Sequence, residues 1–133
     1  MTNLEFGSKG EYLARLFLEK KGFVFIRANY RTQYGEIDLI MQENDEIVFL
    51  EVKTRTFESA EQFGRGADRI DRKKQGHILR SAKVFLREEP KLTKGLFPRF
   101  DAVELYMERN QSETIHVLHT PCAFGFQRQQ NVF

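Results

Sequence analysis

EIDLIM at residues 36–41 and IVFLEVKT at residues 47–54 are two β-prone runs, separated only by QENDE, a string typical of turns. Together they predict a β-hairpin. If the turn is centred between Asn44 and Asp45, antiparallel pairing places Asp38 opposite Glu51. Lys53 then lies further along the same face, opposite Glu36. Both faces of the hairpin are otherwise apolar, so we expect it to lie inside a sheet that is covered on two sides.

The charged side chains of this hairpin predict a metal site. Two carboxylates opposed in a half-buried sheet repel each other by roughly 1 to 4 kcal/mol at about 4 Å. A divalent cation removes this repulsion, and carboxylate oxygens suit octahedral Mg²⁺, with Mn²⁺ as an alternative. Lys53 is then placed to polarise a water molecule or to stabilise charge on a phosphorane. In the alternative interpretation these are ordinary edge charges, and Glu36 forms a weak salt bridge with Lys53.

Upstream of the hairpin, the sequence predicts a helix, a short strand and a basic loop. Ser8 followed by Glu11 is typical of a capping box, and apolar residues then recur at helical spacing up to a glycine, which predicts a helix over residues 9–21. The aromatic run at residues 23–26 predicts a strand, and the polar segment at residues 27–35 predicts a basic loop.

Downstream of the hairpin, the pattern predicts one helix and two strands. Residues 55–69 have no clear period and are expected to form a mobile loop. Asp71 is a suitable N-cap for a second helix that runs to about Glu88. Residues 100–107 and 114–118 then predict two further strands joined by a polar turn.

These elements predict one α/β domain over residues 1–133, with a mixed central β-sheet flanked by helices in the order α-β-β-β-α-β-β and a frayed tail at residues 126–133. A hydrophobic content of 41% is sufficient for one core, and a net charge of only +2 means that affinity for nucleic acid must come from local clusters. The single cysteine, Cys122, and the absence of a membrane-spanning run or signal peptide favour a cytoplasmic protein. Asp101 is expected to pair with a nearby arginine or to cap the loop before its strand.

GEIDLI at residues 35–40 and FLEVKTR at residues 49–55 strongly resemble the motifs of the bacterial YraN-like family of uncharacterised proteins. Further matches extend the resemblance over nearly the whole chain, and they are Gly10, Glu11, Ala14, Gly22, Phe23, Asn29, Arg31, Lys74, Gln75, Arg99, Phe100 and Asp101. That family is similar to the restriction-endonuclease-like, or PD-(D/E)xK, superfamily, and in particular to archaeal Holliday-junction resolvases. The resemblance therefore implies a restriction-endonuclease-like fold.

The resemblance also implies a function. Asp38, Glu51 and Lys53 occupy the superfamily motif, and Glu11 matches its first acidic residue, so Asp38, Glu51 and Glu11 are expected to bind Mg²⁺ as catalytic residues together with Lys53. Glu11 has the alternative role of a helix cap. The expected activity is hydrolysis of DNA, with branched DNA as a candidate substrate and a homodimer as the expected assembly.

Four side chains are the best candidates for contacts with the phosphates of nucleic acid, namely Arg31, Arg55, Lys74 and Gln75. Two other functions remain open at this stage. One is a non-catalytic nucleic-acid-binding module with the same fold. The other is an RNA-processing nuclease, which would share the metal site and differ in substrate.

Overall fold

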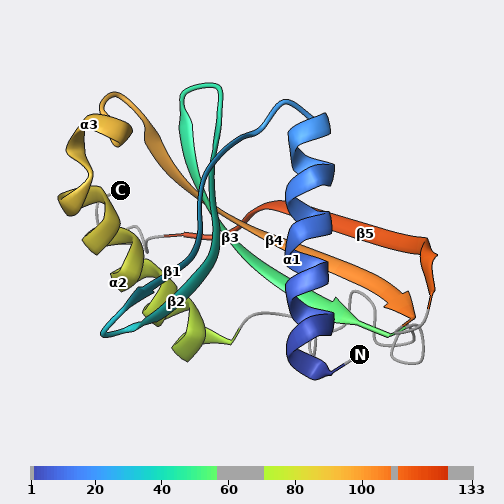
Figure 1. Ribbon diagram of the computed structural model, residues 1–133. Helices are drawn as coiled ribbons and strands as arrows, with labels where there is room; N and C mark the ends of the chain where they lie inside the picture. The colour runs from blue at the N-terminus through green and yellow to red at the C-terminus, as the bar shows by residue number, and fades with distance from the viewer. Residues whose placement is uncertain (1, 57–70, 109–110, 126–133) are drawn as a thin grey trace, which may run out of the picture.

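A computed structural model describes residues 2–56, 71–108 and 111–125 of the chain (Figure 1). The elements are α1 (Asn3–Lys20), β1 (Val24–Thr32), β2 (Gly35–Glu43), β3 (Glu46–Arg55), α2 (Arg72–Glu88), α3 (Pro90–Thr93), β4 (Phe97–Glu108) and β5 (Gln111–Phe124). The strands form one sheet in the order β1-β2-β3-β4-β5, in which β3 and β4 are parallel and the other neighbours are antiparallel. This confirms the predicted α/β class, the mixed sheet and the element order, to which the structure adds the short α3.

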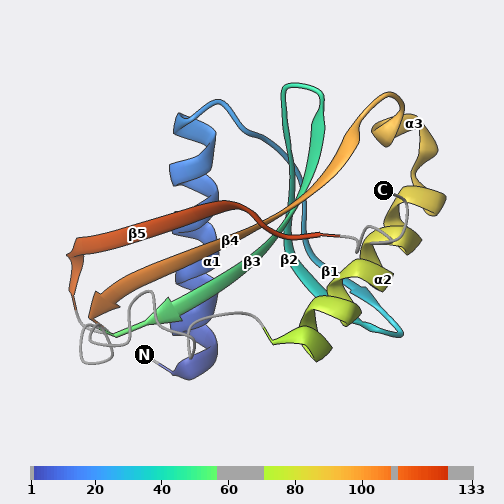
Figure 2. The ribbon, with the colours of Figure 1, turned by 180° about the vertical axis from the view of Figure 1, so that it is seen from behind.

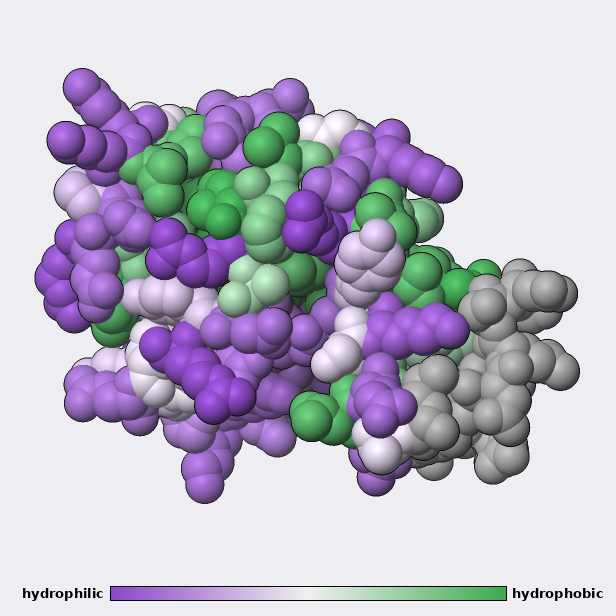
Figure 3. All heavy atoms as spheres, in the orientation of Figure 1, coloured by the Kyte–Doolittle hydropathy of each residue, from purple (hydrophilic) through white to green (hydrophobic). Residues whose placement is uncertain are grey.

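The two long helices cover opposite faces of the sheet, as the two views related by 180° show (Figures 1 and 2). Ala14 and Leu18 of α1 are buried in one cluster against the sheet residues Phe23, Leu39, Met41, Val48, Leu50, Val52, Val103 and Leu105. Ile78, Ala82 and Phe85 of α2 are buried in the other cluster with Ile37, Ile40, Ile47, Phe49 and Phe100. Hydrophilic side chains cover most of the outer face that carries α1 (Figure 3). The hairpin is therefore covered on both sides, as its two apolar faces predict.

The pairing of β2 with β3 has the predicted register, from Glu43 with Glu46 to Leu39 with Leu50. The β2–β3 ladder ends at this pair, one residue before Asp38. In place of the next backbone bond, the amide of Val52 donates a hydrogen bond to Oδ2 of Asp38 at 2.7 Å. The two strands thus separate at Asp38.

The side chain of Ile37 lies on the other face of the hairpin from the one that strict alternation predicts. Strict alternation places Ile37 on the same face as Leu39, but Ile37 packs in the cluster under α2, on the opposite face from Leu39. This exchange of faces occurs next to Asp38, where β2 leaves β3 and pairs on with β1 alone. Perfect alternation holds only where a strand keeps its place in the ladder.

The first helix begins six residues earlier than predicted. It starts at Asn3, and its N-cap is Thr2, whose hydroxyl accepts a hydrogen bond from the Glu5 amide. Ser8 therefore lies inside the helix, and the predicted capping box with Glu11 does not form. Gly7 lies between the true start and the predicted one, and it made a helix there hard to predict because glycine lowers helix propensity. Gly10 has a packing reason, since a Cβ atom there would lie 1.9 Å from the Thr54 hydroxyl of β3.

Several strands are longer than predicted. β1 continues to Thr32, so most of the predicted basic loop at residues 27–35 is strand, and β4 and β5 extend beyond both ends of the predicted runs. In each case pairing with a neighbouring strand accepts polar residues that a sequence pattern reads as loop. The second helix has the predicted bounds, with Asp71 accepting from the Lys74 amide at 2.8 Å. The predicted loop at residues 55–69 lies outside the described residues beyond Thr56, and the predicted tail at 126–133 lies outside them entirely.

A buried polar network fastens the end of the sheet where β4 begins. Arg99 donates to both oxygens of the fully buried Asp101, at 2.9 and 2.7 Å, which confirms the predicted pairing with an arginine. The same guanidinium reaches Glu43 and Glu46 at the β2–β3 turn, at 2.7 and 2.9 Å. His119 of β5 completes the network with a 2.8 Å hydrogen bond to Asp101. Burial alone would raise the pKa of Asp101, but the hydrogen bonds from His119 and Arg99 outweigh it, so this pKa is lowered.

Candidate metal centre

Asp38 stands at the point where β2 and β3 separate, and its carboxyl group is strongly perturbed. Burial raises its pKa from 3.8 to about 8, with the nearby charge of Glu51 as the next cause and that of Glu11 as a smaller one. The hydrogen bond from Val52 acts in the opposite direction but is outweighed. Near neutral pH the metal-free protein therefore holds a proton on a carboxyl group that would ordinarily be ionised.

Glu11 and Glu36 bring two more carboxyl groups to Asp38. One oxygen from each of these three residues lies within 4.8 Å of the others, although they come from α1 and from two positions of β2. Burial and the charges of Glu36 and Glu51 also raise the pKa of Glu11. Three carboxylates at this separation offer the hard oxygen ligands that Mg²⁺ and Mn²⁺ prefer.

Asn29 joins two of these acids from β1. With its amide nitrogen turned towards them, it donates to Oε1 of Glu36 at 2.8 Å and to Oε1 of Glu11 at 3.0 Å. Its φ of 53° is in the left-handed region, which asparagine tolerates better than most residues. Arg31 contacts the same Glu36 at 3.2 Å, with a side chain that is 81% exposed. Polar neighbours thus orient the carboxylates of Glu11 and Glu36.

Glu51 lies on the α2 side of the centre and is only 3% exposed. Its Oε1 forms an ion pair with the ammonium of Lys74, which reaches in from the first turn of α2. Its Oε2 is buried with no hydrogen-bond partner among the described residues. An unpartnered buried carboxylate oxygen is costly, which is typical of a site that binds a cation or a proton.

The other residues proposed from the sequence come from β3 and from the first turn of α2. Lys53 is half-buried in β3, two residues beyond Glu51. The ion pair of Glu36 is with Arg31 rather than with Lys53, so the alternative salt bridge is wrong. Nε of Arg55 lies 3.7 Å from Oε2 of Glu104 in β4. Gln75 follows Lys74 in the first turn of α2.

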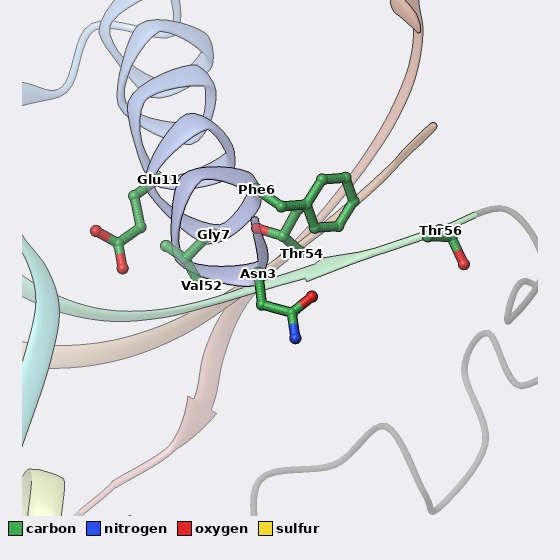
Figure 4. Close-up of a pocket in the computed structure, with 7 residues that line it drawn as sticks. All are labelled: Asn3, Phe6, Gly7, Glu11, Val52, Thr54 and Thr56. Atoms are coloured by element: carbon green, nitrogen blue, oxygen red, sulfur yellow. The ribbon is translucent and has the colours of Figure 1, made fainter. Parts of the chain in front are cut away.

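A pocket of about 290 Å³ adjoins the centre along the N-terminal half of α1 and the end of β3. Its lining residues are Asn3, Phe6, Gly7, Glu11, Val52, Thr54 and Thr56. Glu11 and Phe6 extend from opposite sides of the helix, and the Glu11 carboxylate is directed away from the Phe6 ring (Figure 4). Glu11 is therefore shared between the pocket and the three-carboxylate cluster.

Two features of the centre were missed from the sequence. Glu36 belongs to the three-carboxylate cluster, whereas Glu51 does not and instead pairs with Lys74. Asn29 was noted as a family match but not as a partner of the acids. Its position next to a strand gave a weak signal only, since a left-handed conformation cannot be read from one residue.

Comparison with known proteins places these residues within a larger group. The model of the family described as "Uncharacterised protein family UPF0102" matches residues 10–105, which include all the acids of the centre from Glu11 to Glu51. A UPF0102 protein of Syntrophomonas wolfei is 35% identical over 119 residues, covering 88% of this chain and 97% of the relative. A UPF0102 protein of Caldicellulosiruptor saccharolyticus is 39% identical over 107 residues, covering 80% and 86%, respectively. One of Nitrosomonas europaea is 42% identical over 98 residues, covering 73% and 77%.

Proposed function

This chain belongs to the uncharacterised protein family UPF0102, and from the geometry of its acidic centre we propose that it is a metal-dependent DNA endonuclease. The observation that carries the proposal is the half-buried carboxyl group of Asp38, which lies among three other acids. An arrangement of this kind destabilises the metal-free fold and is hard to explain as a structural device. The restriction-endonuclease-like superfamily is consistent with the family and with the mixed sheet.

The donor set fits Mg²⁺ or Mn²⁺. Asp38, Glu11 and Glu36 offer three oxygens within 4.8 Å of one another, and Glu51 offers a buried oxygen that has no partner among the described residues. All four are carboxylates, whereas Zn²⁺ sites usually contain cysteine or histidine ligands. We propose that Asp38, Glu51 and Glu11 hold the cation and that Glu36 is a further ligand or orients the water molecules around it.

When bound, the cation would lower the pKa of a water molecule and offset negative charge on the phosphate. The chain's own residues do the rest. Lys53 is half-buried in β3, two residues beyond Glu51, and its proposed role is to stabilise with its ammonium the charge that grows on phosphorus-bound oxygens. Asn29 and Arg31 orient Glu11 and Glu36 before substrate arrives, which reduces the cost of assembling the site. Water forms a new P–O bond and loses a proton to solvent, the P–O bond on the opposite side breaks, and its electron pair leaves with the departing oxygen, which takes up a proton from solvent.

The decisive experiment is cleavage of labelled single-stranded, duplex, flap and four-way-junction DNA with Mg²⁺ or Mn²⁺. We expect metal-dependent cutting that Lys53→Met abolishes and that Lys91→Met, an exposed lysine of α3, leaves unchanged. Lys53→Met is also expected to keep Mn²⁺ binding, whereas Glu51→Gln weakens it. Matched RNA junctions in the same panel test the RNA-processing alternative. Tight junction binding with no cutting in any metal would contradict the proposal and favour a binding module.

A further inference from the structure

The contact between Lys74 and Glu51 joins a surface helix to the most buried acid of the centre. Glu51 is 3% exposed, while the Lys74 side chain is 47% exposed, so the ammonium enters the centre from the solvent side. Glu51 is thereby neutralised on one oxygen, and its other oxygen has no partner among the described residues. A buried carboxylate without a cation would be strongly unfavourable, so in the metal-free protein Lys74 supplies the positive charge that the fold requires.

We propose that Lys74 is an internal counter-ion that occupies the Glu51 side of the metal centre in the metal-free protein and is displaced when a divalent cation binds. This inference rests on the metal centre of the proposed function but not on DNA cleavage. It gives Lys74 a positioning role, because the side chain acts on the cation and on Glu51 rather than on a reacting bond.

The position of Lys74 allows this movement without loss of structure. The cap of α2 depends on the Lys74 backbone amide, which donates to Asp71 at 2.8 Å, and not on the ammonium. The side chain is long, flexible and half-exposed, so swinging into solvent breaks one ion pair and no packing of the buried core formed by Ile78, Ala82 and Phe85. The helix can therefore remain in place while the charge leaves.

Competition follows from the geometry. An ammonium on Oε1 of Glu51 repels a divalent cation that approaches the same carboxylate, and it also reduces the negative charge that attracts this cation. Lys74 should thus weaken metal binding. Once displaced, its charge lies at the solvent side of the centre and is available to a phosphate. Binding of metal and of DNA would then favour each other, because each relieves the same ion pair.

The test measures Mn²⁺ affinity without DNA, by isothermal titration calorimetry or by electron paramagnetic resonance. Lys74→Met removes the charge and keeps a flexible side chain of good helix propensity. We expect this variant to bind Mn²⁺ about tenfold more tightly than the unchanged protein, or about 1.4 kcal/mol. Lys73→Met is the matched control, because Lys73 is the exposed neighbour in the same turn, and its affinity should stay within about twofold.

Equal or weaker Mn²⁺ binding by Lys74→Met would overturn the inference, since it would show that Lys74 orients Glu51 for the metal. Lys74→Arg retains the charge, so it should bind no more tightly than the unchanged protein, and tightening in this variant would also contradict competition. A second measurement observes the displacement directly. In protein labelled with ¹⁵N at lysine side chains, Mg²⁺ should shift the Lys74 ammonium signal towards that of a free lysine, and an unchanged signal at saturating Mg²⁺ would refute displacement.

The outcomes separate this inference from the proposed function. Mn²⁺ binding that tightens in Lys74→Met, in a protein that cuts no DNA, supports the counter-ion and refutes the nuclease. Metal-dependent cutting by a protein whose Mn²⁺ binding does not tighten in Lys74→Met supports the nuclease and refutes the counter-ion. No Mn²⁺ binding by either protein would refute the metal centre and with it both proposals.

Discussion

Replacing Asp38 with asparagine should stabilise the metal-free protein at high pH and leave its stability nearly unchanged at low pH. Burial, and then the charge of Glu51, raise the pKa of Asp38 from 3.8 to about 8. Asparagine retains an oxygen that can accept the hydrogen bond from the Val52 amide, so the substitution removes the charge while keeping this contact. Any effect can then be assigned to ionisation.

The magnitude follows from the difference in proton binding between the two states. Between the unfolded pKa of 3.8 and the folded pKa of about 8, the folded protein holds a proton on Asp38 that the unfolded chain has lost. The stability of the metal-free protein therefore falls as pH rises through this window and becomes level above it. At about 1.4 kcal/mol per pH unit, the complete loss is on the order of 6 kcal/mol. Repulsion between two carboxylates about 4 Å apart, roughly 4 kcal/mol near a protein surface, is of the same size.

The assay is urea unfolding of chelator-treated protein at several pH values from about 5 to about 9. The advantage of Asp38→Asn should grow across this range up to the folded pKa. At high pH, saturating Mg²⁺ should stabilise the unchanged protein more than the variant, which has lost a ligand. Asp38→Ala is the control for the lost contact, because it leaves the Val52 amide unpaired and should be less stable than Asp38→Asn at every pH. A difference between Asp38→Asn and the unchanged protein that does not vary with pH would refute the reasoning.

Three further predictions test the metal centre, the helix start and the buried network. Mn²⁺ binding near pH 7 should release about one proton, seen as a buffer-dependent binding enthalpy in calorimetry, because a protonated Asp38 must ionise to become a ligand. Gly7→Ala should raise the free energy of unfolding by about 0.5–1 kcal/mol, since its Cβ would contact nothing within 4 Å inside α1, whereas Gly10→Ala should lower it because of its collision with Thr54. If Gly7→Ala has no effect, α1 does not extend to Asn3. Asp101→Asn should cost about 3–5 kcal/mol in urea unfolding, and because the pKa of Asp101 is lowered, its stabilising effect should be present above pH 3.8 and disappear as pH falls through the folded pKa.

The hairpin and its register could be predicted because they depend on local information. A turn string between two β-prone runs fixes which residues face each other, and Leu39 with Leu50 confirms the expected pairing. The second helix was equally readable, since its cap at Asp71 and its apolar face are both local. By contrast, no local pattern indicates that the β2–β3 ladder stops at Leu39. The next backbone hydrogen bond is replaced by one from the Val52 amide to the side chain of Asp38.

The composition of the centre was less predictable, because helices and strands distant in sequence assemble it. The relation of Glu51 to Lys74 depends on how α2 packs over the sheet, and no spacing in the sequence encodes that distance. The hairpin register placed Glu36 opposite Lys53, and the alternative interpretation joined them by a salt bridge. The strand leaves the ladder next to Glu36, which lies near Glu11 instead. Failures of local rules thus gather at Asp38, which is where a functional site is expected to break them.

The parallel pairing of β3 with β4 has a consequence for the order in which the molecule forms during synthesis. All four acids of the centre lie in the first 51 residues, whereas Lys74 and the whole of β4 are translated later. A nascent chain can close the β2–β3 hairpin quickly, but it then presents the free edge of β3 and a Glu51 carboxylate that still lacks its counter-ion Lys74. An exposed strand edge invites association with other chains, while like charge opposes it. Until Lys74 and β4 are made, the charge of Glu51 beside this edge would thus oppose its pairing with the same edge of another unfinished chain.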